Sequence, residues 1–134
     1  MPRFALLEHT GAPDDPVGRH LDLLVEAGAS CRTWRLAKLP EPGGPPIAAV
    51  ELPPHRLAWL DHQAGEVSGG RGFARRVDAG TWIAATGDAV DVATSSHLAL
   101  QCAGDMLTGC MEISRHGAAA WQVSRARDAS HASQ

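Results

Sequence analysis

Short apolar segments separated by turn residues constrain this chain more than any other feature. Turn-favouring residues recur along it, for example at 40–46, Gly104-Asp105 and His116-Gly117. The runs between them are short and apolar or alternating, and no long segment has the 3.6-residue periodicity of an amphipathic helix. Many short strands at such spacing are typical of an antiparallel β-barrel or β-sandwich, so the sequence predicts a mostly β protein.

The predicted strands follow the apolar runs. They are 3–8, 20–26, 30–36, 47–52, 73–77, 81–85, 90–93, 98–102, 106–113 and 119–124. Pro53-Pro54 should end the fourth strand, and Asp78-Ala79-Gly80 should form a turn between the fifth and the sixth. Segment 55–61 fits either a helical turn or a strand. A chain of 134 residues suffices for one core, so we expect a single domain over 1–126 and a disordered tail over 127–134.

The charge and the cysteines narrow the class of protein. A net charge of −3 and a pI near 6.1 argue against a protein that coats nucleic acid, because such binding depends on many Lys and Arg contacts to phosphates. Recognition of one nucleic-acid end or a small anion stays compatible with these values. Cys31, Cys102 and Cys110 lack Cys-x-x-Cys spacing, which indicates reduced thiols. With no signal peptide and no membrane-length apolar run, we expect a cytoplasmic monomer that does not bind membranes.

Polar and apolar side chains alternate from His20 to Glu26. In a strand, His20 and Asp22 share one face, while the other face is uniformly apolar. The pair brings an imidazole and a carboxylate close enough to bind one divalent ion, and His9 at the end of the preceding strand is a candidate third ligand. Two imidazoles and one carboxylate suit Mn, Fe, Zn or Ni better than Ca or Mg.

The same alternation also fits an ordinary strand whose polar face points to water. Leu24 favours a recessed site, because a fully solvated face has little reason to carry an aliphatic side chain. The residues by themselves leave both interpretations open.

Several ordered motifs extend this pattern over roughly the first 82 residues. They are Arg3-Phe4, Glu8-His9, His20-x-Asp22-x-x-x-Glu26, Arg32-Thr33-Trp34-Arg35-Leu36, His55-Arg56-Leu57-Ala58-Trp59-Leu60-Asp61, Val67-Ser68-Gly69-Gly70-Arg71-Gly72 and Asp78-Ala79-Gly80-Thr81-Trp82. In this order they resemble the 3′-phosphoesterase domain at the N-terminus of bacterial DNA ligase D and its stand-alone relatives. Further on, the likeness is limited to Leu107-x-Gly109 and a final strand with Trp121.

The resemblance implies a compact antiparallel β-barrel of short strands with minor flanking helices. It also implies an enzyme dependent on Mn²⁺, or on another divalent transition metal such as Zn²⁺. Such an enzyme removes a 3′-terminal phosphate or ribonucleotide from DNA or RNA and leaves a hydroxyl that a separate DNA ligase can use. Matched residue by residue, the metal ligands fall on His9, His20 and Asp22, the catalytic histidine at the phosphate falls on His55, and a phosphate-binding lysine falls on Lys38.

Two further residues are candidates for binding the substrate. Arg71 lies in the glycine-rich loop 66–72, where backbone amides can approach an anion closely. We hypothesise that it replaces an arginine that the ligase-attached domain carries at the position of Leu24. Trp59 is the tryptophan that we expect to stack on a base. The other tryptophans, expected in the core, are Trp34, Trp82 and Trp121.

Two other classes of function compete with the enzyme. The first is a non-catalytic module of the same fold that binds a nucleic-acid end or a repair partner, which the apolar Leu24 favours. The second is a non-haem Fe(II) oxygenase, because two histidines and one carboxylate are also the ligands of that class. In those enzymes the third ligand lies well downstream of the His-x-Asp pair, whereas His9 lies upstream.

Overall fold

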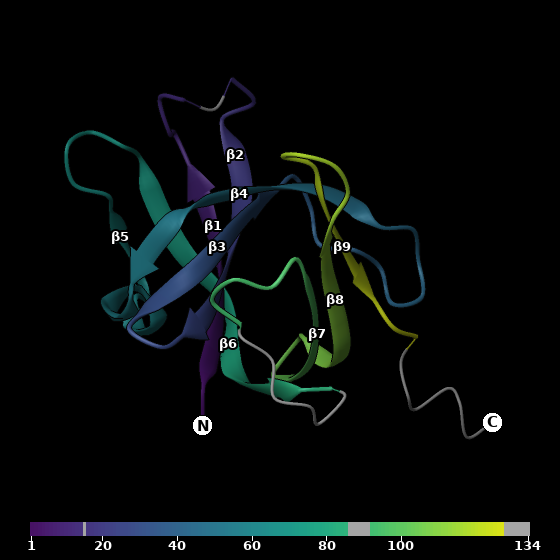
Figure 1. The fold of residues 1–134 in the computed structure, drawn as a ribbon. Helices are drawn as coiled ribbons and strands as arrows, with labels where there is room; N and C mark the ends of the chain where they lie inside the picture. The colour runs from purple at the N-terminus through teal and green to yellow at the C-terminus, as the bar shows by residue number, and fades with distance from the viewer. Residues whose placement is uncertain (15, 86–91, 128–134) are drawn as a thin grey trace.

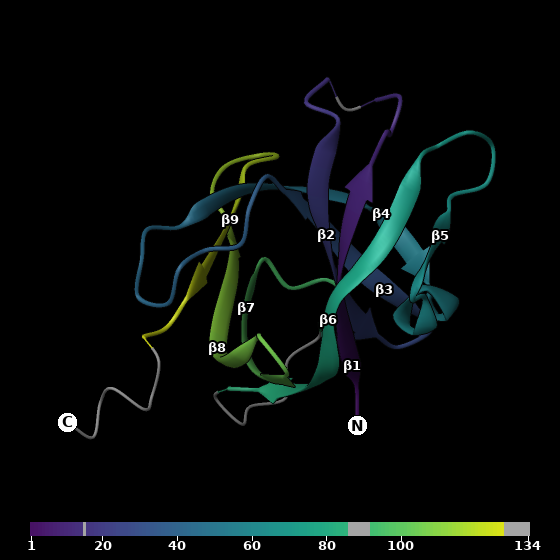
Figure 2. The same ribbon diagram turned by 180° about the vertical axis from the view of Figure 1, so that it is seen from behind.

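Eight antiparallel strands close into a barrel in this computed structural model, which describes residues 1–14, 16–85 and 92–127. Their order around the barrel is β1-β2-β3-β4-β9-β8-β7-β6, and the pairing of β1 with β6 closes it (Figure 1). A ninth strand, β5, lies outside the barrel and pairs with β6 (Figure 2). The strands are β1 (Arg3–Thr10), β2 (Arg19–Ala27), β3 (Ser30–Leu36), β4 (Ile47–Arg56), β5 (Ala64–Glu66), β6 (Phe73–Ala84), β7 (His97–Gly104), β8 (Thr108–Arg115) and β9 (Trp121–Arg125). The predicted mostly β barrel is confirmed.

One short 3-10 helix, η1 (Leu57–Asp61), joins β4 to β5. Segment 55–61, which fitted either a helical turn or a strand, is therefore divided between the end of β4 and η1. Leu60 is buried and anchors η1 against the outer face of the barrel. None of the helical structure in the described ranges is long and apolar enough to cross a membrane.

Strand β2 is buried on both faces. Its odd-numbered side chains, among them Leu23, belong to the large core inside the barrel. On the opposite face, Leu24 belongs to a second, smaller core that also includes Leu7 and Leu60. Strand β2 is therefore not an ordinary half-solvated strand, because the face that carries its polar residues is covered as well.

Strand β4 continues through the two prolines that were expected to end it, so that prediction is wrong. Thr33 pairs with Leu52, but Cys31 pairs with His55, so one extra residue is accommodated near Pro53-Pro54. A proline lacks the N–H that a central strand donates. Among the described residues, β9 pairs only with 47–49 of β4, so the other edge of β4 has no sheet partner there at the prolines and tolerates them.

Strand β6 runs without a break through Asp78-Ala79-Gly80, where the sequence predicted a turn between two strands. The pairing with β1 shifts by one residue between Leu6 and Leu7, and a bulge of this kind bends a strand. The first part of β6 pairs with β5 and the last part with β7, so the bend carries it from the outer ribbon into the barrel. Asp78 is buried and accepts hydrogen bonds from three backbone N–H groups of 105–107, at 2.7–3.0 Å.

The last strands are predicted correctly except for one. Strands β7, β8 and β9 correspond to the predictions 98–102, 106–113 and 119–124, with ends that differ by a few residues. The predicted strand 90–93 is wrong where it is described, because Val92 and Ala93 lie in a turn; 90–91 are outside the described residues. The predicted tail also lies outside them, apart from the exposed Arg127.

Three tryptophans lie in the barrel core, as predicted: Trp34, Trp82 and Trp121. The buried guanidinium of Arg32 lies over two of them, 4.7 Å from the centre of the Trp34 ring and 5.2 Å from that of Trp121. It also donates to both carboxylate oxygens of Glu51, at 2.7 and 3.0 Å, and to two carbonyls of the segment before β7. Arg32 thus connects β3, β4 and that segment at one end of the barrel.

Candidate metal centre

His9 and His20 lie directly opposite each other in the antiparallel pair of β1 and β2. Opposite residues in such a pair point to the same face, and the two imidazole rings are 4.9 Å apart at an angle of 68°. Asp22 follows two residues after His20 on that face. One potential ligand atom from each of the three residues lies within 4.8 Å of the others, so the predicted metal cluster comes together in space.

Hydrogen bonding fixes the tautomer of His9. Its Nε2 lies 2.6 Å from the carbonyl oxygen of Arg71, and because a carbonyl only accepts, Nε2 carries the hydrogen. In the neutral ring the lone pair is then on Nδ1, which lies 3.7 Å from Oδ2 of Asp22. Metal-binding histidines usually have this arrangement, in which the second nitrogen donates to a backbone carbonyl.

The carboxylate of Asp22 fits a cation. Asp22 is buried, and its Oδ1 accepts no hydrogen bond from any described residue. That oxygen lies 3.4 Å from Nε2 of His20 and 3.8 Å from Nε of Arg35. A buried carboxylate oxygen without a hydrogen bond is costly unless a cation compensates it. Together with two imidazoles it forms a donor set suited to Mn, Fe, Zn or Ni.

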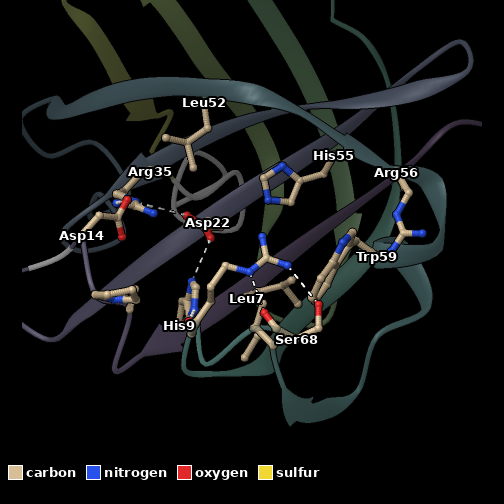
Figure 3. Close-up of a pocket in the computed structure, with 15 residues that line it drawn as sticks. Leu7, His9, Asp14, Asp22, Arg35, Leu52, His55, Arg56, Trp59 and Ser68 are labelled. Atoms are coloured by element: carbon tan, nitrogen blue, oxygen red, sulfur yellow. Dashed lines mark hydrogen bonds and ion pairs between the residues drawn. The ribbon is translucent and has the colours of Figure 1, made fainter.

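The cluster opens onto a pocket of about 560 Å³ on the outer face of β1, β2 and β3 (Figure 3). His55, Trp59 and Arg71, three of the predicted site residues, line the same pocket as His9 and Asp22. Lys38 does not line it; this side chain is exposed in the segment after β3, because the chain leaves the barrel wall there. The role in phosphate binding that the resemblance implied for Lys38 stays a prediction.

The extra residue near Pro53-Pro54 decides where His55 points. In a regular strand, Leu52 and His55 would lie on opposite faces, because they are three positions apart. The shifted pairing places His55 opposite Cys31, and both Leu52 and His55 line the pocket. The Nδ1 of His55 lies 3.2 Å from the carbonyl oxygen of Pro53, so Nδ1 donates to it and Nε2 is left to exchange a proton.

The glycine-rich turn holds His9 in place through its backbone. Gly72 has φ +95°, and a Cβ at this position would clash with the carbonyl oxygen of Thr10. This close approach places the carbonyl of Arg71 against His9. The guanidinium of Arg71 instead donates to Ser68, from Nε to the carbonyl at 2.7 Å and from Nη2 to Oγ at 3.1 Å. Two donors of the guanidinium are thus used within the turn, and the hypothesis that Arg71 replaces an arginine at the position of Leu24 stays a prediction.

Trp59 and Leu24 differ from each other in exposure. Trp59 is partly exposed, with its ring centre 6.2 Å from that of His55 and 4.7 Å from that of His62. It lines the pocket, so it stays a stacking candidate. Leu24 is fully buried in the second core and does not reach the pocket, so its presence on the polar face reflects packing beside the site.

Sequence reasoning missed Arg35 and Asp14. Arg35 lies directly opposite Asp22 in the pairing of β2 with β3, lines the pocket, and donates from Nη1 to Oδ2 of Asp14 at 3.2 Å. The signal for Arg35 was in the sequence. A hairpin over 20–36 with its turn at Gly28 pairs Asp22 with Arg35. No comparable signal pointed to Asp14, which lies in the loop between β1 and β2.

The chain matches no protein-family model, and a comparison with curated protein sequences gives no match either. The case for a function therefore depends on the geometry of the pocket and on the resemblance of the ordered motifs.

Proposed function

We propose that this protein is a metal-dependent phosphoesterase that processes the 3′ ends of DNA or RNA by removing a terminal phosphate or ribonucleotide. One observation carries the proposal: His9, His20 and Asp22 come together, and His9 and Asp22 line a pocket that His55 also lines. The resemblance of the ordered motifs to the phosphoesterase domain of DNA ligase D also supports it. The partners in this proposal are nucleic-acid 3′ ends and a separate ligase that uses the product.

The three clustered side chains are the proposed ligands of Mn²⁺ or a similar ion, with His9 contributing Nδ1. When bound, such an ion supplies Lewis-acid chemistry and lowers the pKa of a coordinated water. The carbonyl of Arg71 keeps His9 in the tautomer that this role needs. Asp22 is buried beside Arg35, with its Oδ1 3.8 Å from Nε of the guanidinium.

His55 is the proposed general acid. Its Nδ1 is held by the carbonyl of Pro53, so a proton gained or lost in the reaction is carried at Nε2. A histidine is suited to this role because its ordinary pKa lies near neutrality. From the β4 side of the pocket, the protonated ring donates to the oxygen that leaves the phosphorus. Trp59 lies beside it and offers a ring face to the terminal base.

The direct test is incubation of the purified protein with Mn²⁺ and a primer-template whose primer ends in a 3′-phosphate. We expect release of inorganic phosphate and a primer that a ligase can join. Asp22→Asn should abolish the release, whereas His97→Ala, an exposed histidine paired with Glu112, should not alter it. Intact primer after long incubation with Mn²⁺, Zn²⁺ or Fe²⁺ would reject the proposal.

A non-catalytic module that binds nucleic-acid ends or a repair partner is the second candidate. It is favoured by Leu24, which is buried and apolar at the position where the ligase-attached domain carries an arginine. Binding of the primer-template without trimming, unchanged in His55→Ala, would select this candidate.

A further inference from the structure

Three arginines line the pocket. Their guanidinium groups differ in how many of their N–H groups already donate hydrogen bonds. The donors of Arg71 are directed at Ser68, within its own turn. Arg56 is an exposed residue at the end of β4. Arg35 projects from the barrel wall, with 23% of its side chain exposed, beside the carboxylate of Asp22.

Among the described residues, the guanidinium of Arg35 makes one hydrogen bond, from Nη1, so Nη2 keeps its donors for a ligand in the pocket. Its Nε is buried, makes no hydrogen bond to a described residue, and lies 3.8 Å from Oδ1 of Asp22. Its Nη1 donates to Oδ2 of Asp14 at 3.2 Å. The Asp14 side chain is 69% exposed, so this carboxylate reaches the guanidinium from the solvent side of the pocket (Figure 3).

We propose that Arg35 is the residue that recognises the anionic group of the substrate, a phosphate monoester, and that Asp14 occupies its guanidinium until that group displaces it. The choice of a phosphate monoester as the ligand rests on the proposed function. The position of Arg35 does not: it follows from the pairing with Asp22 and from the pocket lining.

The exchange is physically reasonable because the two anions differ in charge and in geometry. An exposed ion pair such as Arg35–Asp14 contributes little, since water and salt screen it. A phosphate monoester carries more charge and presents several oxygens, which a planar guanidinium binds through two parallel hydrogen bonds. A phosphate held by Arg35 lies next to Asp22 and therefore next to the cluster of ligands.

The two residues therefore affect binding in opposite directions. Removing Arg35 removes the recognition of the phosphate. Removing the charge of Asp14 frees the guanidinium and strengthens that recognition. A purely structural role for the Arg35–Asp14 pair predicts a different result, because both changes would then weaken the protein in the same direction.

The experiment compares two primer-templates that differ only in a 3′-phosphate or a 3′-hydroxyl. Their affinities are measured by fluorescence anisotropy in EDTA, so that no trimming occurs and no bound ion contributes. The preference is the ratio of the two dissociation constants. We expect Arg35→Gln to reduce this preference about tenfold, the effect of losing one or two charge-assisted hydrogen bonds. We expect Asp14→Asn to raise it about two- to threefold, as for an exposed ion pair.

Controls separate recognition from folding. Arg115→Gln changes a remote arginine near Trp121 and should keep the preference of the unaltered protein. Arg35→Lys retains the charge without the planar fork and should restore only part of the preference. Circular-dichroism melting curves identify any variant that fails to fold. A raised preference for the 3′-phosphate end in Asp14→Asn cannot come from unfolding.

An unchanged preference in Arg35→Gln, or a preference that falls in Asp14→Asn, would overturn this inference. So would an unaltered protein that binds both ends equally. The proposed function fails differently: the preference would depend on Arg35 as expected, but Mn²⁺ would produce no trimming. Conversely, trimming that persists without any role of Arg35 in binding would leave the proposed function standing alone.

Discussion

His55 faces Cys31 across β3 and β4, where a regular continuation of the pairing between Thr33 and Leu52 would place Pro54. This shift of one residue brings His55 to the same side of the sheet as Asp22. The prolines that interrupt the hydrogen-bonding pattern of β4 therefore also assemble the pocket.

Replacing His55 with alanine should reduce trimming of a 3′-phosphate primer about 100-fold, the usual contribution of a general acid. Binding of Mn²⁺ should not change, because His55 is not one of the three clustered ligands. Single-turnover release of phosphate and calorimetric titration of Mn²⁺ measure the two effects. Equal loss of activity and of metal binding would contradict the role assigned to His55.

Addition of Mn²⁺ should raise the melting temperature, because an ion that binds only the folded chain stabilises it. At a concentration 100 times the dissociation constant, the gain is about 2.7 kcal/mol. Asp22→Asn should remove most of this shift in melting temperature, because the variant lacks the ionised carboxylate that is proposed to bind the ion. His97→Ala is the matched control, because His97 is exposed and pairs with Glu112 outside the cluster. The same shift in all three proteins would place the ion elsewhere.

Gly72→Ala should disturb the metal cluster although residue 72 is not a ligand. Its methyl group would collide with the carbonyl of Thr10, and its positive φ disfavours any side chain. The turn must shift, and the carbonyl of Arg71 then moves away from His9. We expect Mn²⁺ affinity to fall about tenfold, as for loss of a group that orients a ligand. Gly70→Ala, where no atom lies near a Cβ, is the control for the cost of positive φ.

Arg32→Met should destabilise the barrel, because Glu51 then loses its partner and the two tryptophans lose a stacked cation. Removing one partner of a largely buried ion pair costs about 3 kcal/mol. Urea denaturation followed by tryptophan fluorescence measures the change in the free energy of unfolding. If Arg32→Met/Glu51→Leu is as stable as the single variant, the unpaired carboxylate is not the cause.

The cysteines should differ in reactivity in the native protein. Burial raises the pKa of Cys31 to about 11 and that of Cys102 to about 12. Because the thiolate is the nucleophile, both should resist alkylation at pH 8, and their rates should rise with pH up to those values. Cys110, which is partly exposed, should be modified first. Mass spectrometry after iodoacetamide treatment, with and without urea, checks the order.

Local sequence determined most of the strands and placed His20 and Asp22 on the same face of one strand. Alternation has a period of two, so it assigns faces without reference to the rest of the fold. The register of β2 and β3 was also local, because a tight hairpin fixes it, and it placed Arg35 opposite Asp22. The bulges in β4 and β6 were not predictable in this way, since each depends on which strand lies alongside.

Local patterns predict a mostly β chain that carries His20 and Asp22 on one face of β2. Burial of this polar face depends on distant segments, since the second core of Leu7, Leu24 and Leu60 forms when η1 packs against the barrel. The contact of His9 with His20 and the place of His55 in the pocket also depend on the complete fold. These relations join residues far apart in the sequence, and they depend on barrel closure and on register shifts that no local pattern encodes.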